Sequence, residues 1–326
     1  MEAQRRRAGL DRLLIALLAC AAAALPACGG GDDESKTNTA TTAAATPAAA
    51  DPSLLRPEGR PLRPRVVEVR RAGGIVVRGI TFTAGRGDER VPAALATPAR
   101  GPVRACLVYQ GGIGSTLAQA RPVWEAAAQL GVATLTIEMP SHGRRDSGGE
   151  LDRARGDAGA FAALLRGIVL DVRRGLDALV QQPACRGKRI GYLGESLGGF
   201  AGTLAAAVDK RIAATVLLVV GGDWRLMADA PVPVLNFRLN AATLRALGPY
   251  DPVLWVGRIA PRPLLMINGR EDQTVPLAAA ERLHRAARRP KEVMLYDGGH
   301  DPFAAGSYDL VMDRIAAFLQ RRLIGG

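Results

Sequence analysis

After Ser115, apolar strands alternate regularly with helix-length segments, and this alternation limits the chain to few folds. Gly-bounded strands separated by such helices need right-handed crossovers and therefore form a mostly parallel sheet covered by helices on both faces. We predict an α/β protein. In chain order its elements are a helix at 116–130, a strand at 132–138, a helix at 157–182, a strand at 188–193, a helix at 197–208, strands at 212–220 and 263–268, a helix at 276–289, a strand at 292–296 and a helix at 308–323.

Four short β-branched segments precede this alternation: "RVVEVRR", "GIVVRGITFTA", "RVPAALATP" and "RACLVYQGG". Gly and Pro separate them, which predicts strands in hairpin-like connections. Residues 223–260 differ, because they contain four Pro and four aromatic residues and are too irregular for a plain crossover. We expect them to form a short lid inserted between two strands.

The N-terminus has the layout of a secretory signal peptide, with four arginines among residues 1–12 before an apolar run at 13–25. The run is too short for a comfortable membrane span. It closes on "LPAC", which resembles the lipobox of bacterial lipoproteins. The resemblance implies a signal peptide at 1–27 and a lipid anchor at Cys28, which would hold the protein on the extracytoplasmic face of a membrane. "LLAC", ending at Cys20, is a competing match, and ordinary cleavage that releases a soluble protein is the other alternative.

Residues 28–61 consist largely of Gly, Asp, Thr, Ala and Pro, so they cannot offset their ordering entropy by burial. We predict a disordered tether there and a catalytic domain at 62–326. The formal net charge is +12, and a basic surface on an anchored protein attracts anionic head groups or steers acidic substrates. The favoured interpretation of this charge is an arginine-rich composition, with the arginine side chains spread over solvated faces. No basic block is interleaved with aromatics, so nucleic acid is not an expected partner.

Beyond the N-terminus, the chain has two cysteines, Cys106 and Cys185. Neither has metal-ligand spacing or a nearby histidine, and we predict no metal and no organic cofactor. The two can pair in an oxidising compartment. Cys106 lies in an apolar strand, and the favoured interpretation is a small buried hydrophobic residue.

"GESLGG" at 194–199 follows a predicted strand and opens a predicted helix. In this context Gly-x-Ser-x-Gly indicates a sharp turn that exposes the serine. A sharp turn there leaves no room for a Cβ at Gly194 or Gly198 and lifts a serine oxygen above the sheet. Ser196 is therefore a candidate nucleophile.

A serine hydroxyl needs a base, and the chain has three histidines. His300, in "YDGGHDPF", follows a strand, where its side chain can reach the carboxyl ends of the sheet, and it is the favoured base. His284 lies on a charged helix and is interpreted as a solvated surface residue. His142, in "PSHG", is the alternative base, and otherwise it shapes the wall of the pocket.

The acid that orients the base is expected at another strand end. Asp272, in "NGREDQTVP", follows an apolar strand and precedes His300 by 28 positions, room for one helix and one strand. Glu271 and Asp223 remain alternatives.

The order Ser, Asp, His, the nucleophile turn and the strand–helix alternation resemble the α/β-hydrolase superfamily over residues 66–323. "GESLGG", "NGREDQTVP" and "GGH" look most like the branch of dienelactone hydrolases and acetyl esterases, which is related to the catalytic domain of prolyl-oligopeptidase-type peptidases. The resemblance implies backbone oxyanion donors at Leu197 and at Gly112, in "YQGGIGS". Gln110 stands where this loop usually has His, a departure that rearranges its side-chain hydrogen bonds.

The function predicted is a serine carboxylic-ester hydrolase that acts on a small-molecule ester through an acyl-enzyme, with Ser196, His300 and Asp272 as catalytic residues. The alternatives are a prolyl-oligopeptidase-like peptidase and a catalytically inactive, surface-anchored binding protein on the same fold. The ester, its acyl-chain length and the oligomeric state are left open.

Overall fold

The computed structural model describes residues 50–228, 230–231 and 234–325. These residues form one nine-stranded sheet in the order β1-β2-β3-β5-β4-β6-β7-β8-β9. The predictions for the signal peptide and for Cys28 lie outside the described residues. The strands are β1 (Arg65–Ala72), β2 (Ile75–Thr83), β3 (Arg90–Pro98), β4 (Ala105–Gln110), β5 (Val132–Ile137), β6 (Ile190–Glu195), β7 (Ile212–Leu218), β8 (Leu264–Gly269) and β9 (Lys291–Tyr296).

The sheet has an antiparallel edge and a parallel body. Strands β1, β2 and β3 pair antiparallel in sequence, and β3 pairs antiparallel with β5. From β5 to β9 every neighbouring pair is parallel. The prediction of hairpin-like connections is therefore right for the first three strands and wrong for β4. All six residues of β4 are buried, and a strand buried on both faces takes a central place in a sheet.

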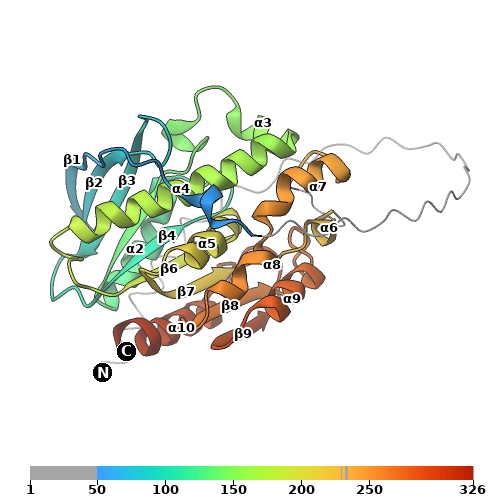
Figure 1. Cartoon of the computed structure of the whole chain (residues 1–326). Helices are drawn as coiled ribbons and strands as arrows, with labels where there is room; N and C mark the ends of the chain where they lie inside the picture. The colour runs from blue at the N-terminus through green and yellow to red at the C-terminus, as the bar shows by residue number, and fades with distance from the viewer. Residues whose placement is uncertain (1–49, 229, 232–233, 326) are drawn as a thin grey trace, which may run out of the picture. The chain divides into compact units, whose positions relative to one another are not determined.

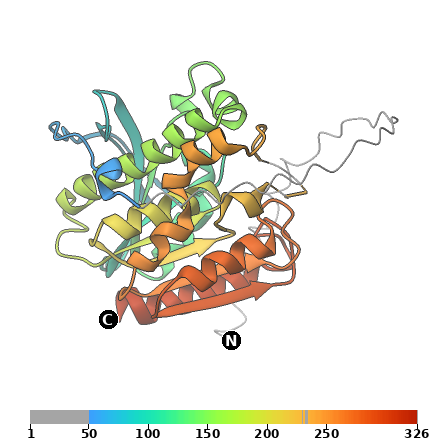
Figure 2. The same cartoon turned by 45° about the vertical axis from the view of Figure 1, so that its right-hand side comes forward.

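Helices cover both faces of the sheet, as predicted. Residues of α4 and α5 belong to one hydrophobic cluster, and residues of α2 and α10 to the other. The antiparallel strands form one edge and the C-terminal elements gather at the other in both views (Figures 1 and 2). The helices are α2 (Arg121–Gln129), α3 (Glu150–Gly156), α4 (Ala158–Gln181), α5 (Leu197–Val208), α6 (Trp224–Met227), α7 (Ala241–Leu247), α8 (Pro252–Trp255), α9 (Leu277–Ala286) and α10 (Tyr308–Leu319).

The folded part begins before Leu62, so the predicted tether is too long at its C-terminal end. A short 3₁₀ helix, η1 (Pro52–Leu55), leaves Leu55 fully buried. Arginines of α4 hold the carbonyl groups of this segment: Arg166 Nε donates to Leu54 O at 2.7 Å, and Arg173 donates to Leu55 O. Because these donors lie more than a hundred positions away in sequence, local composition does not reveal the contact.

Cys106 and Cys185 form a disulfide, with their Cα atoms 5.9 Å apart. The interpretation of Cys106 as an unpaired buried residue is therefore wrong, although both cysteines are buried. The bond joins β4 to the turn before β6. Its half-cystines are 79 positions apart, so it closes a long loop and restricts the unfolded chain.

The described part of the insertion at 223–260 has two roles. Helix α8 and the 3₁₀ helix η5 (Val256–Arg258) pack on α5 and serve as the crossover between β7 and β8. Helix α7 instead packs on α4 (Figure 1). Trp224 of α6 stacks on Phe200 of α5, with ring centroids 5.5 Å apart, and fixes the start of the insertion to the body. Within the described residues, none of the helices combines the length and the apolar character needed to cross a membrane.

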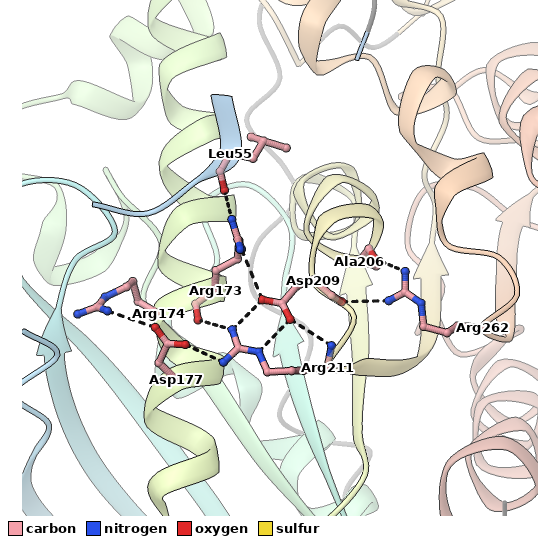
Figure 3. A network of polar contacts seen from close by, with 8 residues as sticks. All are labelled: Leu55, Arg173, Arg174, Asp177, Ala206, Asp209, Arg211 and Arg262. Carbon is pink, nitrogen blue, oxygen red and sulfur yellow. Dashed lines mark hydrogen bonds and ion pairs between the residues drawn. The ribbon is translucent and has the colours of Figure 1, made fainter. Parts of the chain in front are cut away.

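A network of ion pairs lies where β7 begins, at the C-terminal end of α5 (Figure 3). Arg211 donates to both carboxylate oxygens of Asp209, at 2.9 and 2.7 Å, and to Asp177 at 2.6 Å. Arg262 donates to the carbonyl oxygens of Ala206, Asp209 and Ile212. Burial works to raise the pKa of Asp209, but the hydrogen bonds from Arg211 outweigh it and hold the pKa below its usual value. The network ties α4, α5 and β7 together at this end of the sheet.

Candidate active site

Ser196 lies in a sharp turn between β6 and α5. Its φ of 49° and ψ of −119° are unusual for a residue with a side chain. The turn is close to the loop that follows β4, because a Cβ built on Gly198 would stand 2.3 Å from the carbonyl oxygen of Gln110. A Cβ on Gly194 would stand 2.6 Å from the carbonyl oxygen of Gly198. Both glycines are therefore required by close approach, as the motif predicts.

The structure brings Ser196, His300 and Asp272 into one hydrogen-bonded chain. Ser196 Oγ and His300 Nε2 are 2.9 Å apart, and His300 Nδ1 and Asp272 Oδ2 are 2.8 Å apart. The Asp272 side chain is fully buried, whereas 28% of the His300 side chain is exposed. The geometry fits an imidazole that donates from Nδ1 to the carboxylate and accepts a hydrogen bond from the serine hydroxyl at Nε2.

Backbone hydrogen bonds fix Asp272 and the histidine loop in place. Asp272 Oδ1 accepts from the N–H groups of Thr274 and Val275, both at 2.8 Å, so its Oδ2 is left to face the imidazole. Tyr296 Oη donates to the carbonyl oxygen of Gly299 at 2.6 Å, next to His300. Because β8 and β9 are parallel neighbours, the acid and the base follow adjacent strand ends, as their spacing predicts.

The other histidines make different contacts. His284 is only 8% exposed, and its Nε2 lies 2.9 Å from Asn268 Oδ1, so its interpretation as a solvated residue is wrong. It lies on the face of α9 that also buries Leu283. Burial, assisted by Lys291, lowers the pKa of His284 to about 4. His142 is 1% exposed and its Nδ1 lies 2.8 Å from the carbonyl oxygen of Pro140. It is His300 that pairs with Ser196.

The alternative acids also lie in other contacts. Glu271 is exposed, and its backbone N–H donates to the carbonyl oxygen of Gly298. The Asp223 carboxylate caps α6 by accepting from the N–H of Arg225, and it faces Arg282 at 4.0 Å. Asp272 is the carboxylate that contacts His300.

Two backbone segments border the serine at the expected oxyanion positions. Leu197 is the first residue of α5, and an N–H in the first turn of a helix has no intrahelical acceptor. Gly112 is close enough that a Cβ built on it would stand 3.4 Å from Ser196 Cβ and 3.9 Å from Ser196 Oγ. Gln110, in the place of the usual His, accepts a hydrogen bond at Oε1 from Ile137 N at 3.0 Å. It therefore joins the end of β4 to β5.

The sequence analysis did not single out Glu195, the residue before Ser196, although its side chain is part of a partly buried hydrogen bond. Its Oε2 accepts a hydrogen bond from the Tyr109 hydroxyl at 3.1 Å. Burial raises the pKa of Glu195. The signal was present in the motif, since a carboxylate at the end of a buried strand needs a partner.

This chain is similar to known proteins in sequence and in fold. The model of the prolyl oligopeptidase family matches residues 166–323. Acetyl xylan esterase 1 from Thermoanaerobacterium sp. JW/SL YS485 superposes with a TM-score of 0.66 at 20% identity, covering 83% of this chain and 95% of that one. The acetyl xylan esterase from Paenibacillus sp. R4 superposes with a TM-score of 0.64 at 20% identity, covering 81% and 90%.

A curated relative is the uncharacterized protein YfhR of Escherichia coli (strain K12), which is 22% identical over 157 residues, or 47% of this chain and 53% of that protein. The chain thus spans about half the length of the curated relatives it matches. The structural likeness shows that this chain has the α/β-hydrolase fold, as predicted. The family match and the esterase folds together support a serine hydrolase.

Proposed function

We propose that this chain is a serine carboxylic-ester hydrolase that works through an acyl-enzyme. The observation that carries the proposal is the hydrogen-bonded chain from Ser196 through His300 to Asp272, with distances of 2.9 and 2.8 Å. A carboxylate, an imidazole and a hydroxyl in this order are the groups needed to activate a serine at neutral pH. The strained turn holds the hydroxyl above the sheet, within reach of a bound ester.

In the first half of the reaction, Ser196 Oγ attacks the ester carbonyl carbon while His300 Nε2 takes the hydroxyl proton. The carbonyl π electrons move to oxygen, and the N–H groups of Leu197 and Gly112 stabilise the oxyanion. The oxyanion then collapses, the bond to the alcohol oxygen breaks, and His300 returns the proton to the leaving alcohol. Asp272 stabilises the imidazolium formed in between.

In the second half, His300 Nε2 takes a proton from water, whose oxygen attacks the acyl carbon. Collapse of this second oxyanion breaks the bond to Ser196 Oγ, which regains its proton from His300. The products are a carboxylic acid and an alcohol, and the enzyme returns to its starting state.

Small acyl groups, acetyl among them, are the substrate class we propose. Support comes from the acetyl xylan esterases that share the fold over more than four fifths of this chain. The test is hydrolysis of p-nitrophenyl acetate, butyrate and octanoate by the full chain and by Ser196→Ala. We expect serine-dependent turnover that falls as the acyl chain lengthens. Turnover by Ser196→Ala at the wild-type rate would contradict the proposal.

A peptidase is the second candidate, and the match of the prolyl oligopeptidase family over residues 166–323 favours it. The same serine chemistry cleaves an amide when the leaving amine is protonated by the histidine. Chromogenic prolyl amides compared with the esters separate the two candidates. We expect at least about a hundredfold preference in kcat/KM for the ester, whereas efficient prolyl-amide cleavage would favour the peptidase.

We propose that the enzyme works on the extracytoplasmic face of a membrane, anchored through Cys28, with release as a soluble protein as the alternative. The lipobox-like "LPAC" and the Cys106–Cys185 disulfide support this location, since disulfides persist in oxidising compartments. Detergent phase partition of the expressed chain tests the anchor. We expect the wild type in the detergent phase and Cys28→Ser in the aqueous phase.

A further inference from the structure

We propose that the β1 edge of the sheet is a docking surface for anionic phospholipid headgroups at a membrane. This surface consists of three valines and four arginines on or next to β1: Arg63, Arg65, Val66, Val67, Val69, Arg70 and Arg71. It lies at the end of the sheet farthest from β9 (Figure 1). Its contact with the bilayer is made by the protein itself and does not require a lipid on Cys28.

The apolar part of the surface is unusual for a strand that faces water. All eight residues of β1 are exposed. Val66, Val67 and Val69 are 55%, 62% and 55% exposed, and they are three of the six large hydrophobic residues exposed in the described part of the chain. The other three are scattered singly over other elements, which is ordinary. Three valines within four positions form a patch that calls for a partner.

The charge around these valines is strongly positive. Residues 60–90 contain eight arginines, no lysine and three carboxylates. Among the described residues, Arg63, Arg65 and Arg71 form no ion pair, whereas Arg70 pairs with Glu68. Burial lowers the pKa of Arg90, and the neighbouring cations Arg65 and Arg63 lower it further. The surface therefore attracts anions.

An open hollow next to the β1 edge shares Arg63 with this surface and extends it. Its lining includes three arginine side chains and one carboxylate: Arg60, Pro61, Arg63, Thr83, Asp88 and Arg90. Arg60 pairs with Asp88 at 2.7 Å and with Glu58 at 2.9 Å, and Arg90 donates to the Arg63 carbonyl oxygen and to the hydroxyls of Thr81 and Thr83. Within the described residues, the guanidinium of Arg63 has no acceptor. An unengaged guanidinium beside two other cations suits the phosphate of a lipid headgroup.

A bilayer fits this surface better than a second copy of the chain or an added peptide strand. The register shifts at Val67, and a bulge on an edge strand disrupts the flat row of groups that another strand would need. Two copies paired through β1 would also bring arginine-rich strands of the same sign together. An interface between water and lipid accepts valines on both faces of a strand and arginines around them.

The direct test places a polarity-sensitive dye on the surface. The full chain carrying Cys20→Ser, Cys28→Ser and Val67→Cys is labelled with acrylodan, since Cys106 and Cys185 are bonded to each other. The matched control carries Arg288→Cys, an exposed position that precedes β9 at the opposite edge. Both are mixed with phosphatidylcholine vesicles, with and without about 30% phosphatidylglycerol. We expect a blue shift only for the Val67 label and only with the anionic vesicles.

The charges are tested by two triple variants with equal loss of net charge. Arg63→Gln, Arg65→Gln and Arg71→Gln together should weaken binding to the anionic vesicles about tenfold or more at low salt. The control, Arg153→Gln, Arg186→Gln and Arg288→Gln, removes three exposed arginines elsewhere and should change binding less than about threefold. Thermal melting confirms that each variant folds.

Three results would overturn the proposal. The first is a Val67 label that does not shift when the chain binds anionic vesicles. The second is an equal loss of binding in the two triple variants. The third is a blue shift without vesicles that grows with protein concentration, which would assign the β1 edge to a second copy.

Discussion

Helix α5 has a cluster of polar side chains at each end, and the two clusters are bonded very differently. At its N-terminal end, Ser196 is held in a strained turn, and within the described part of the chain its hydroxyl has a single side-chain partner, His300. At its C-terminal end, both carboxylate oxygens of Asp209 accept hydrogen bonds from arginine, and these arginines bind further carboxylate and carbonyl groups (Figure 3). Twelve residues of helix separate the two clusters.

This difference indicates that the cluster at the N-terminal end of α5 serves the reaction and that the cluster at its C-terminal end stabilises the fold. The serine cluster joins a hydroxyl, an imidazole and a carboxylate through two hydrogen bonds, and these are the groups that the proposed reaction uses. The charged side chains of the Asp209 cluster are arginines and carboxylates, and they bond to one another and to backbone carbonyl oxygens. Changes in the first cluster should remove turnover, whereas changes in the second should lower the free energy of unfolding.

The largest effect is expected from His300→Ala. Without a base, ester turnover should fall by about 10⁴-fold, because the remaining rate comes only from binding and the oxyanion groups. The melting temperature should stay close to that of the wild type, since 28% of the His300 side chain is exposed. The control is His142→Ala, which should keep its turnover per folded molecule. A wild-type rate in His300→Ala would place the base elsewhere.

At the other end of α5, Asp209→Asn should cost about 3 kcal/mol of unfolding free energy, because it removes the buried carboxylate that Arg211 and Arg173 share and leaves Arg211 with Asp177 alone. Turnover per folded molecule should change less than about twofold. Urea denaturation and ester kinetics measure the two quantities. Asp177→Asn, whose side chain is 35% exposed, is the matched control and should cost less than about 1 kcal/mol. Equal losses of unfolding free energy in the two variants would contradict the larger contribution assigned to Asp209.

The buried His284 predicts a pH dependence of stability that is separate from catalysis. Its pKa falls from about 6.5 in the unfolded chain to about 4 in the folded one. The neutral imidazole therefore contributes stability above pH 6.5 that is lost as the pH falls toward 4, by up to about 3 kcal/mol. His284→Gln keeps a donor for Asn268 but does not titrate. The difference in unfolding free energy between the wild type and His284→Gln should therefore change between pH 6.5 and pH 4. A difference that stays constant over this range would refute the lowered pKa of His284.

The smallest effect is expected from Gln110→Met, which keeps the volume but removes the acceptor for Ile137 N. A buried N–H without a partner costs about 1 to 2 kcal/mol of unfolding free energy. Turnover should fall only a few-fold, since the proposed oxyanion donors are backbone groups. A loss of turnover above about a hundredfold would instead give Gln110 a part in the chemistry.

Much of the architecture could be predicted from the sequence, because the central strands β4, β5 and β8 are continuous buried and mostly apolar runs. Strand β3 was predicted at 90–98 and spans Arg90–Pro98. The turn at Ser196 was predictable too, because two glycines at fixed positions are required by close approach. The pairing of Asp272 with His300 followed from the rule that neighbouring parallel strands end at the same edge.

The failures share a different cause, which is contact between residues distant in sequence. The segment at 50–61 docks through arginines that belong to α4, and Cys106 meets Cys185 across 79 positions. His284 was misjudged because its neighbours in sequence are charged, while its own side chain lies on the inward face of α9. Local composition describes such residues poorly, since burial is decided by which face of a helix meets the sheet.

The most direct test of the proposed chemistry is reaction of the full chain with a fluorophosphonate, followed by mass spectrometry of the intact protein and its peptides. We predict one adduct per chain, on Ser196 alone, and no adduct in Ser196→Ala or in wild type that has first been unfolded. A folded wild type that forms no adduct, or forms it on another serine, would contradict the assignment of Ser196 as an activated nucleophile.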